Sequence, residues 1–432
     1  MGRLRIEHGL VLPMDPPGAT IADGVVVVEG GEITYVGAAS DAPPGQGEEV
    51  LDATGCLVLP GLVNAHTHVS MTLLRGYADD LALEEWLGGK IWPAEMRLRR
   101  EDVYWGAMLG IVEMIRGGVT TFNDMYHYFD AVADAALDAG IRACVSGVLI
   151  GLIPGADEIF QQAVEFTAAL KERAHPRLVP MLAPHAPYSC PDELLVRTAE
   201  AAAELGVRLH IHVAETEREV TDSLAEHGAT PVGHLAQLGF FDVPTVACHC
   251  VHLTDEDIAI LAERQVGIAH CPTSNMKLAS GFARVADLLR AGACLGLGTD
   301  GAASNNNLDM FEEMMVGAVI AKGHAGNPEV VSAVEMLAMA TRGSAAALGL
   351  DHQIGTLAPG KKADIVVIDP WRPHLQPLHN PISHLVYAAR ADDVRDVVIE
   401  GSVVLRDRQL TSLDEGEIIA KAREAAEHLV GA

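Results

Sequence analysis

The chain has 432 residues, 49% of them hydrophobic, with 59 acidic against 30 basic side chains and a formal net charge of −29. The high apolar fraction excludes a chain that is disordered throughout, because disordered chains lack the apolar surface needed to form a core. The acidic balance argues against a nucleic-acid-binding surface, which needs clustered lysine and arginine, and it also disfavours highly anionic substrates.

The first residues are charged where a secretory signal needs an apolar segment, and no apolar run approaches the ~18 residues of a membrane span. We therefore expect a cytoplasmic protein that binds neither a membrane nor nucleic acid. Cys248 and Cys250 flank His249, but no second Cys/His pair lies at zinc-finger spacing, so a zinc knuckle is not expected. The seven cysteines are irregularly spaced, which indicates reduced, mostly buried thiols.

Residues 20–37 predict a β-hairpin, since an apolar run is followed by a Gly30-Gly31 turn and a second alternating segment. Similar segments lie at residues 363–368 and 394–405, the latter interrupted at Gly401. Because chain ends usually lie close together at the surface, we expect one small β-sandwich domain built from residues 1–57 and 356–410. We expect residues 411–432 to form a C-terminal helix.

Residues 58–355 alternate short β-rich runs with alanine-rich helical stretches, the pattern of βα units around a parallel sheet. Eight such strands close a barrel, so the predicted fold class is α/β, a (β/α)8 TIM-type barrel with the terminal β-sandwich added. Helices are expected at residues 130–139, 193–205 and 255–264, the last with Thr254 as N-cap. The eight runs are residues 58–65, 118–124, 141–148, 178–184, 207–213, 245–250, 266–271 and 294–299.

Metal-competent residues follow the predicted strands, and the active site of such a barrel lies at the carboxyl ends of its strands. His66 and His68 end the first run, where residues two apart point to the same face. A single His-x-His pair is a weak signal, because it also occurs on strands that face solvent.

Four more strand ends carry such residues, and this convergence is what favours a metal site. The fifth run ends in H-I-H-V-A-E, in which we expect His212 to reach the rim and His210 to lie in an interior layer. The sixth and seventh runs contribute His249 and His270, and Asp300 follows the eighth.

Three neutral imidazoles and one carboxylate suit a single divalent ion, Zn²⁺ in the first place and Fe²⁺ as the alternative. Water bound to such a zinc ion has a pKa of about 7, which indicates a hydrolase. The predicted ligands are His66, His68, His212 and Asp300.

Three residues are the candidate catalytic groups. Glu215 is the candidate proton shuttle, although a carboxylate at a helix start is the alternative interpretation. His249 is expected to orient the attacking water, and Asp300 to accept its proton.

Several segments resemble the amidohydrolase superfamily. They are L-P-G-L-V-N-A-H-T-H, M-T-L-L-R-G, H-V-A-E, C-H-C-V-H, C-P-T-S-N and G-T-D-G-A-A-S-N-N, together with G-T-L-A-P-G-K-K-A-D-I-V-V-I-D near the C-terminus. Within the superfamily, nearly the whole chain is similar to the methylthioadenosine/S-adenosylhomocysteine deaminase branch of the chlorohydrolase and deaminase group. The resemblance implies a mononuclear site, because the fourth run ends in A-P-H-A-P-Y without the lysine that bridges two metals in binuclear relatives.

The resemblance also implies a set of substrate-binding residues. His185 matches the position that contacts the bound nucleoside, Glu95 matches the acid that accepts hydrogen bonds from ribose hydroxyls, and Trp86 resembles a pocket wall. Ser304, in the G-T-D-G-A-A-S-N-N segment, is expected to bind substrate as well. Without the resemblance, Trp86 reads as a helix core residue and Glu95 as a solvated charge.

The chain departs from the family pattern in one place. Relatives grip the carboxylate of homocysteine-bearing substrates with arginine near the third strand, whereas residues 146–158 contain no basic residue. A charged tail would lose its bidentate partner there, so we expect a preference for small or apolar 5′ groups over S-adenosylhomocysteine. Arg75 or another loop is the alternative source of the missing charge.

These observations predict a hydrolytic deaminase that converts the adenine ring of adenosine, 5′-methylthioadenosine or S-adenosylhomocysteine to the inosine-type product and releases ammonia. One alternative is an enzyme of the same class acting on guanine, 8-oxoguanine or a triazine, which have no ribose for Glu95 to bind. The non-enzyme alternative is a catalytically silent scaffold, which usually lacks metal ligands that this chain keeps. The resemblance further implies a homo-oligomer, a dimer or a tetramer.

Overall fold

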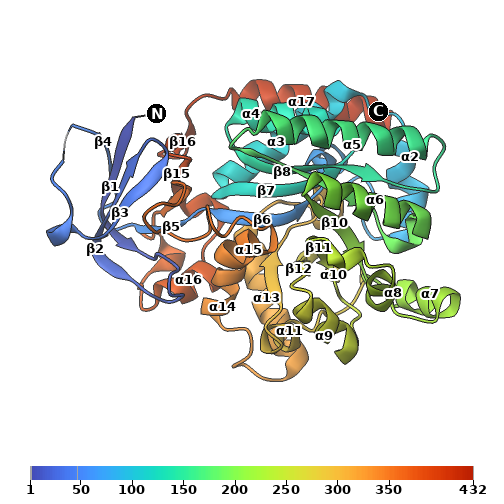
Figure 1. Ribbon diagram of the computed structural model, residues 1–432. Helices are drawn as coiled ribbons and strands as arrows, with labels where there is room; N and C mark the ends of the chain where they lie inside the picture. The colour runs from blue at the N-terminus through green and yellow to red at the C-terminus, as the bar shows by residue number, and fades with distance from the viewer. Residues whose placement is uncertain (1, 46, 432) are drawn as a thin grey trace.

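The strands of the protein form two sheets, one of which is the core of a barrel (Figure 1). The structure is a computed structural model that describes residues 2–45 and 47–431. In these residues the strands join into an eight-stranded sheet, ordered β6 to β13 in sequence, and a nine-stranded sheet that combines both ends of the chain.

The barrel sheet is parallel throughout, with neighbours in sequence also neighbours in space. Its two edge strands meet where the backbone N–H of Asp300 donates to the carbonyl of His66 at 3.0 Å, and where the N–H of Thr299 donates to the Asn64 side chain at 3.0 Å. The predicted eight-stranded α/β barrel is therefore confirmed. Its strands are β6 (Leu62–Thr67), β7 (Val119–Tyr126), β8 (Arg142–Leu149), β9 (Leu178–Pro184), β10 (Arg208–Val213), β11 (Thr245–His249), β12 (Gly267–His270) and β13 (Cys294–Leu297).

The predicted first run, residues 58–65, is wrong as a single strand. Residues Leu57–Pro60 form β5, which pairs with strands of the terminal sheet, and the barrel begins only at Leu62. The break falls at Gly61, where a Cβ atom would lie 2.1 Å from the Thr120 hydroxyl oxygen, so the chain crosses between the sheets at a position that only glycine fits. Both strands are fully buried, which is why the apolar run continues across the break.

The second sheet unites the two ends of the chain, as the sequence predicts. The expected hairpin of residues 20–37 is present as β2 and β3, and β5 joins the N-terminal strands to the C-terminal ones. Apolar side chains from both ends pack in one core, among them Ile6, Val26 and Val367. The strands are β1 (Arg3–Val11), β2 (Ile21–Glu29), β3 (Glu32–Ala38), β4 (Glu49–Asp52), β5 (Leu57–Pro60), β14 (Ile365–Ile368), β15 (Val394–Ile399), β16 (Ser402–Arg406) and β17 (Gln409–Leu410).

Helices follow most of the barrel strands and include the three expected from the sequence. Thr254 caps α9 as predicted, since its hydroxyl accepts the backbone N–H of Asp257 while the Asp257 carboxylate accepts the N–H of Thr254. The helices from the barrel's first strand to α9 are η2 (Val69–Leu74), α1 (Leu83–Trp86), η3 (Leu87–Ile91), α2 (Trp92–Glu95), α3 (Arg100–Arg116), α4 (Phe129–Ala139), α5 (Ala156–Arg173), η4 (Pro187–Ser189), α6 (Asp192–Leu205), α7 (Glu217–His227), α8 (Pro231–Gln237), η5 (Phe240–Asp242) and α9 (Asp255–Glu263).

The C-terminal helix α17 (Glu415–Val430) lies along α3 at the side of the barrel (Figure 1). The guanidinium of Arg97 donates to the carbonyl of Leu429 at 2.9 Å, and Arg116 pairs with Glu415 at 2.5 Å. The other helices are η1 (Ala39–Asp41), α10 (Pro272–Lys277), α11 (Val285–Arg290), α12 (Ala302–Asn305), α13 (Met310–Ala325), α14 (Ala333–Ala338), η6 (Met339–Gly343), α15 (Ser344–Ala347), η7 (Pro373–Leu375), α16 (Pro381–Tyr387) and η8 (Ala391–Asp393).

The domain boundaries at residues 57/58, 355/356 and 410/411 stay predictions. Met1, Gln46 and Ala432, which fall within the predicted ranges, lie outside the described residues.

Candidate active site

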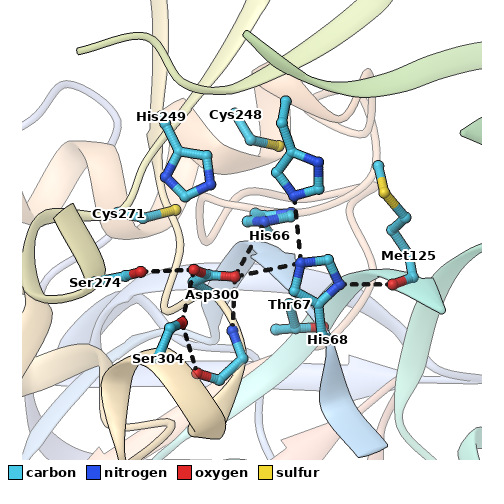
Figure 2. A network of polar contacts seen from close by, with 12 residues as sticks. His66, Thr67, His68, Met125, Cys248, His249, Cys271, Ser274, Asp300 and Ser304 are labelled. Carbon is cyan, nitrogen blue, oxygen red and sulfur yellow. Dashed lines mark hydrogen bonds and ion pairs between the residues drawn. The ribbon is translucent and has the colours of Figure 1, made fainter. Parts of the chain in front are cut away.

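The carboxyl ends of β6, β10 and β13 bring the four predicted metal ligands to one place. Figure 2 shows three of them, His66, His68 and Asp300. One oxygen of Asp300 lies 3.4 Å from Nε2 of His66 and 3.3 Å from Nε2 of His68. Nε2 of His212 lies 3.3 Å from Nε2 of His68. The predicted convergence of these side chains is therefore present in the structure, whereas their role as ligands stays a prediction.

Backbone carbonyls fix which ring nitrogen of His68 and of His212 faces the predicted metal position. Nδ1 of His68 lies 2.6 Å from the carbonyl oxygen of Met125, and Nδ1 of His212 lies 2.6 Å from that of His185. A carbonyl only accepts hydrogen bonds, so Nδ1 carries the proton in both rings and each Nε2 keeps its lone pair. The two Nε2 lone pairs therefore face each other across 3.3 Å, and they repel unless a cation lies between them.

The remaining polar groups also fit a bound cation. Nε2 of His66 is buried and has no hydrogen-bond partner among the described residues. The second oxygen of Asp300 accepts the hydroxyls of Ser274 at 2.6 Å and Ser304 at 2.8 Å, which fixes the carboxylate with its first oxygen toward the imidazoles (Figure 2). Although burial alone would raise it, the nearby histidines hold the pKa of Asp300 well below its usual range. Three imidazoles and an ionised carboxylate match a zinc-type site with an open position.

His210 lies one layer deeper, as predicted, and contacts the predicted ligand His66. Nδ1 of His66 lies 2.9 Å from Nε2 of His210, which also contacts the side-chain amide of Asn123 at 3.3 Å and the thiol of Cys248 at 3.1 Å. A proton on Nδ1 of His66 leaves Nε2 of that ring free for a metal.

Cys248 and Cys250, which flank His249, are both buried free thiols. The thiol of Cys248 faces His210, and the thiol of Cys250 lies 3.9 Å from the carbonyl of Ala247. Burial raises the pKa of both thiols, which disfavours the thiolate form that binds zinc.

Glu215 and His249 lie beside the predicted metal position. Oε2 of Glu215 is 4.0 Å from Nε2 of His249, and its other oxygen accepts the hydroxyl of Ser280 at 3.3 Å. Nδ1 of His249 lies 2.9 Å from the amide oxygen of Asn275 and donates to it, which points Nε2 toward Glu215. Burial raises the pKa of Glu215, so this carboxyl holds a proton more readily than an exposed glutamate.

Glu219 was not selected from the sequence, yet it holds the backbone of the candidate proton shuttle. Its carboxylate accepts the backbone N–H of Ala214 at 2.9 Å and that of Glu215 at 2.8 Å. Ala214 has a positive φ of 51°, an uncommon conformation for alanine that these bonds stabilise. The only signal in the sequence is the spacing of the two glutamates, which is common in helices.

A pocket opens from the predicted metal ligands and contains three of the four predicted substrate-binding residues, Trp86, Glu95 and His185. Trp86 lines this pocket and is also buried, and its contact with substrate stays a prediction. Oε1 of Glu95 is buried and has no hydrogen-bond partner among the described residues. Glu95 is therefore not the solvated charge that its sequence context alone would suggest.

Ser304 and Arg75 lie elsewhere. Ser304 is not among the described residues that line the pocket; its buried hydroxyl is bound to Asp300, and its contact with substrate stays a prediction. Arg75 pairs with Glu113, donates to the carbonyl of Asn306 and is not among the described residues that line the pocket, and its role as a source of charge stays a prediction.

Histidines and an aspartate at the strand ends of a barrel form the type of site found in metal-dependent hydrolases. Comparisons with known proteins agree with this class. Residues 57–404 match the Amidohydrolase family, so the chain belongs to that family. It is 49% identical to a 5-methylthioadenosine/S-adenosylhomocysteine deaminase of Moorella thermoacetica, over 98% of each chain. It is 47% identical to a 5′-deoxyadenosine deaminase of Methanothermobacter thermautotrophicus, over 95% of this chain and 96% of that one.

A solved structure extends the similarity to the whole fold. An adenosine deaminase from Xanthomonas campestris with bound zinc superposes with a TM-score of 0.95 at 40% identity, over 99% of each chain. In the described part of this chain, no helix combines the length and apolar character needed to cross a membrane.

Proposed function

We propose that the protein is a metal-dependent hydrolytic deaminase that converts the adenine ring of adenosine-type nucleosides to the inosine-type product and releases ammonia. The proposal is supported by its membership of the Amidohydrolase family and by its similarity, at 47–49% identity over nearly the whole chain, to deaminases named for adenine nucleosides.

The observation that carries the proposal is the unpartnered oxygen of Glu95. A buried carboxylate oxygen without a donor is costly, and Oε1 of Glu95 lies in the wall of the pocket that also contains Glu215 and Asp300. Ribose hydroxyls would donate to this oxygen while the base extends toward the predicted metal ligands. A free guanine or a triazine has no hydroxyls to satisfy it, so this carboxylate favours a nucleoside over the alternative substrates.

The residues of the site have distinct tasks in this reaction. A divalent ion, when bound by His66, His68, His212 and Asp300, would lower the pKa of water to about 7 and so supply a nucleophile. Glu215 donates its proton to N1 of the ring, which makes C6 more electrophilic. It then takes the second proton of the attacking water from the new C6 hydroxyl and passes it to the amino group, which leaves as ammonia, and the proton held by Asp300 restores the acid form of Glu215. His249 orients the attacking water with Nε2, and Asp300 accepts the proton that this water releases.

We propose Zn²⁺ as the native ion, because three imidazoles and one carboxylate suit it and the similar adenosine deaminase carries zinc. Fe²⁺ is the alternative. Metal analysis of protein purified without added metal distinguishes the two. The expected homo-oligomer, a dimer or a tetramer, remains part of the proposal and is checked by light scattering.

The function is tested by an ultraviolet assay of adenosine, 5′-methylthioadenosine, guanine and a chlorotriazine with zinc-loaded protein. We expect turnover of the two nucleosides alone. Glu215→Gln is the control, and it should keep the bound metal while kcat falls by about 10²-fold or more, because the general acid is lost. Deamination of guanine but not of adenosine would overturn the proposal, and absence of both metal and turnover would favour the silent scaffold.

A further inference from the structure

Helices α6, α7 and α8 bring a second group of metal-competent side chains together on the outside of the barrel (Figure 1). Asp192 is the first residue of α6, His227 is the last residue of α7, and His234 lies on α8. One ligand atom from each of these residues lies within 4.8 Å of the other two. Among the described residues, the other candidate metal groups all contain His66 of the predicted active site, whereas this one shares no residue with that site. We call it the outer cluster.

The two imidazoles of the outer cluster are stacked. The ring centroids of His227 and His234 lie 3.7 Å apart, with an angle of 16° between the ring planes. Nε2 of His234 also lies 2.8 Å from Oδ1 of Asp192. The side chain of His234 is buried, whereas those of His227 and Asp192 are 27% and 50% exposed. The protein therefore holds one imidazole in place, and an ion can reach it from solvent past the other two side chains.

The spacing of these atoms is close to that of a zinc site. A tetrahedral zinc ion with bonds of about 2.1 Å holds its ligand atoms roughly 3.4 Å apart, so atoms up to 4.8 Å apart have to approach by about 1 to 1.5 Å. The ion lies in the plane of each imidazole that binds it, so the ring of His227 has to tilt out of the stack. It can do so because its side chain is partly exposed at the end of a helix. Zinc then takes the place of the proton between His234 and Asp192, and that proton moves to Nδ1 of the ring.

The surroundings of the outer cluster favour a cation. A cavity of about 320 Å³ adjoins it, lined by Asp192, Asp222, Glu226 and His227 among others. No lysine or arginine of residues 2–45 and 47–431 lines this cavity. Asp222 pairs with Arg218 at 3.3 Å, whereas Asp192 and Glu226 contact the histidines of the cluster, Oε2 of Glu226 at 3.9 Å from Nε2 of His227. Two carboxylates are therefore placed to offset the charge of a divalent ion.

We propose that the outer cluster is a second metal site, which binds Zn²⁺ through His227, His234 and Asp192. Two imidazoles and one carboxylate are a donor set that suits zinc, with water in the fourth position. The ion joins three helices on the outside of the barrel. This site is weaker than the predicted active-site position, because it has one ligand fewer and two of its side chains must be ordered on binding. It therefore fills only after the active-site position is occupied.

The test is a calorimetric titration of metal-free protein with zinc, followed by metal analysis of the saturated protein. We expect two zinc ions per chain, with dissociation constants that differ by about 100-fold or more. Anomalous diffraction at the zinc absorption edge, from crystals of the saturated protein, should place the weaker ion between His227, His234 and Asp192. One ion per chain at saturation, or a second ion at another place, would overturn the proposal.

Substitutions locate the second ion. His227→Ala should weaken its binding by about tenfold or more, because loss of a ligand costs at least as much as loss of a hydrogen-bond partner of a ligand. Asp192→Asn should do the same, since an amide is a poorer zinc ligand than a carboxylate. Both variants should keep the first ion. His324→Ala is the matched control, because it also removes an imidazole from a ring stack, against Phe282, and it should keep both ions. His68→Ala should give the converse result, loss of the first ion and retention of the second.

The outcomes separate this proposal from the proposed function. If His227→Ala and Asp192→Asn both bind the second ion as tightly as the unaltered protein, the outer site is wrong, whatever the activity of the enzyme. If two ions bind as expected but no adenine nucleoside is deaminated, the proposed function fails and the outer site stands.

Discussion

His210 contacts a predicted metal ligand without being one. Its Nε2 atom lies 2.9 Å from Nδ1 of His66 and 3.3 Å from the side-chain amide nitrogen of Asn123, which can only donate, so we infer that Nε2 accepts the proton of His66. We expect His210→Ala to weaken zinc binding by about 10- to 100-fold, because the buried Nδ1–H of His66 would lose its acceptor. The measurement is the zinc dissociation constant, obtained by competition with a chelator of known affinity.

His210→Gln is the matched variant, since an amide oxygen can accept the same proton. We expect its zinc affinity to lie closer to that of the unaltered protein. Equal weakening by both substitutions would indicate loss of packing rather than of the hydrogen bond, and an unaltered affinity in His210→Ala would remove His210 as a positioning residue.

Residues at strand ends could be selected from the sequence, while those that support them could not. The alternation of a strand shows that His210 and His212 share a face, and their order shows which lies nearer the rim. Ser280 contacts Glu215 from a loop and Glu219 contacts it from the first turn of α7, and no periodic pattern predicts either contact. A glutamate in the first turn of a helix, such as Glu219, is ordinarily explained by the helix dipole.

Helix α13 carries a buried acid that joins α10 and α12, two short helices at the barrel rim. Glu313 accepts the backbone N–H of Thr273 at 3.3 Å and the side-chain amide of Asn305 at 2.5 Å, and these residues follow β12 and β13. Burial raises the pKa of Glu313 from 4.5 to about 8. The folded protein therefore keeps this proton over a pH range in which the unfolded chain releases it.

Because unfolding releases that proton, the contribution of Glu313 to the free energy of unfolding falls as pH rises from about 5 to 8. We expect Glu313→Gln to reduce this fall by on the order of 2 kcal/mol. Urea unfolding at pH 5 and pH 8 measures it. Glu312→Gln, on the same helix but only partly buried, is the control and should keep the original pH dependence; an unchanged dependence in Glu313→Gln would contradict the argument.

Whole elements were predictable where apolar residues repeat with a single helical or strand period along their length, as in α4, α6 and the hairpin of β2 and β3. The boundary between β5 and β6 was not, because both strands are buried and the change of sheet leaves the apolar run intact. No pattern of residue types in the sequence predicts the backbone conformation at the site either. His249 and Asp300 have positive φ values of 68° and 63°, which the surrounding hydrogen bonds impose.

Zinc should stabilise the molecule as a whole, because its predicted ligands follow strands from the beginning, middle and end of the barrel. At a free zinc concentration 1,000 times its dissociation constant, binding adds about 4 kcal/mol to the free energy of unfolding. We expect the Tm of metal-free protein to rise by about 4 to 5 °C when zinc is added, measured by calorimetry. His68→Ala should lose most of this shift, since one of the facing Nε2 atoms is gone. His8→Ala, which removes an exposed histidine of the terminal sheet, should keep it. A full shift in His68→Ala would mean that zinc acts at another place in the protein.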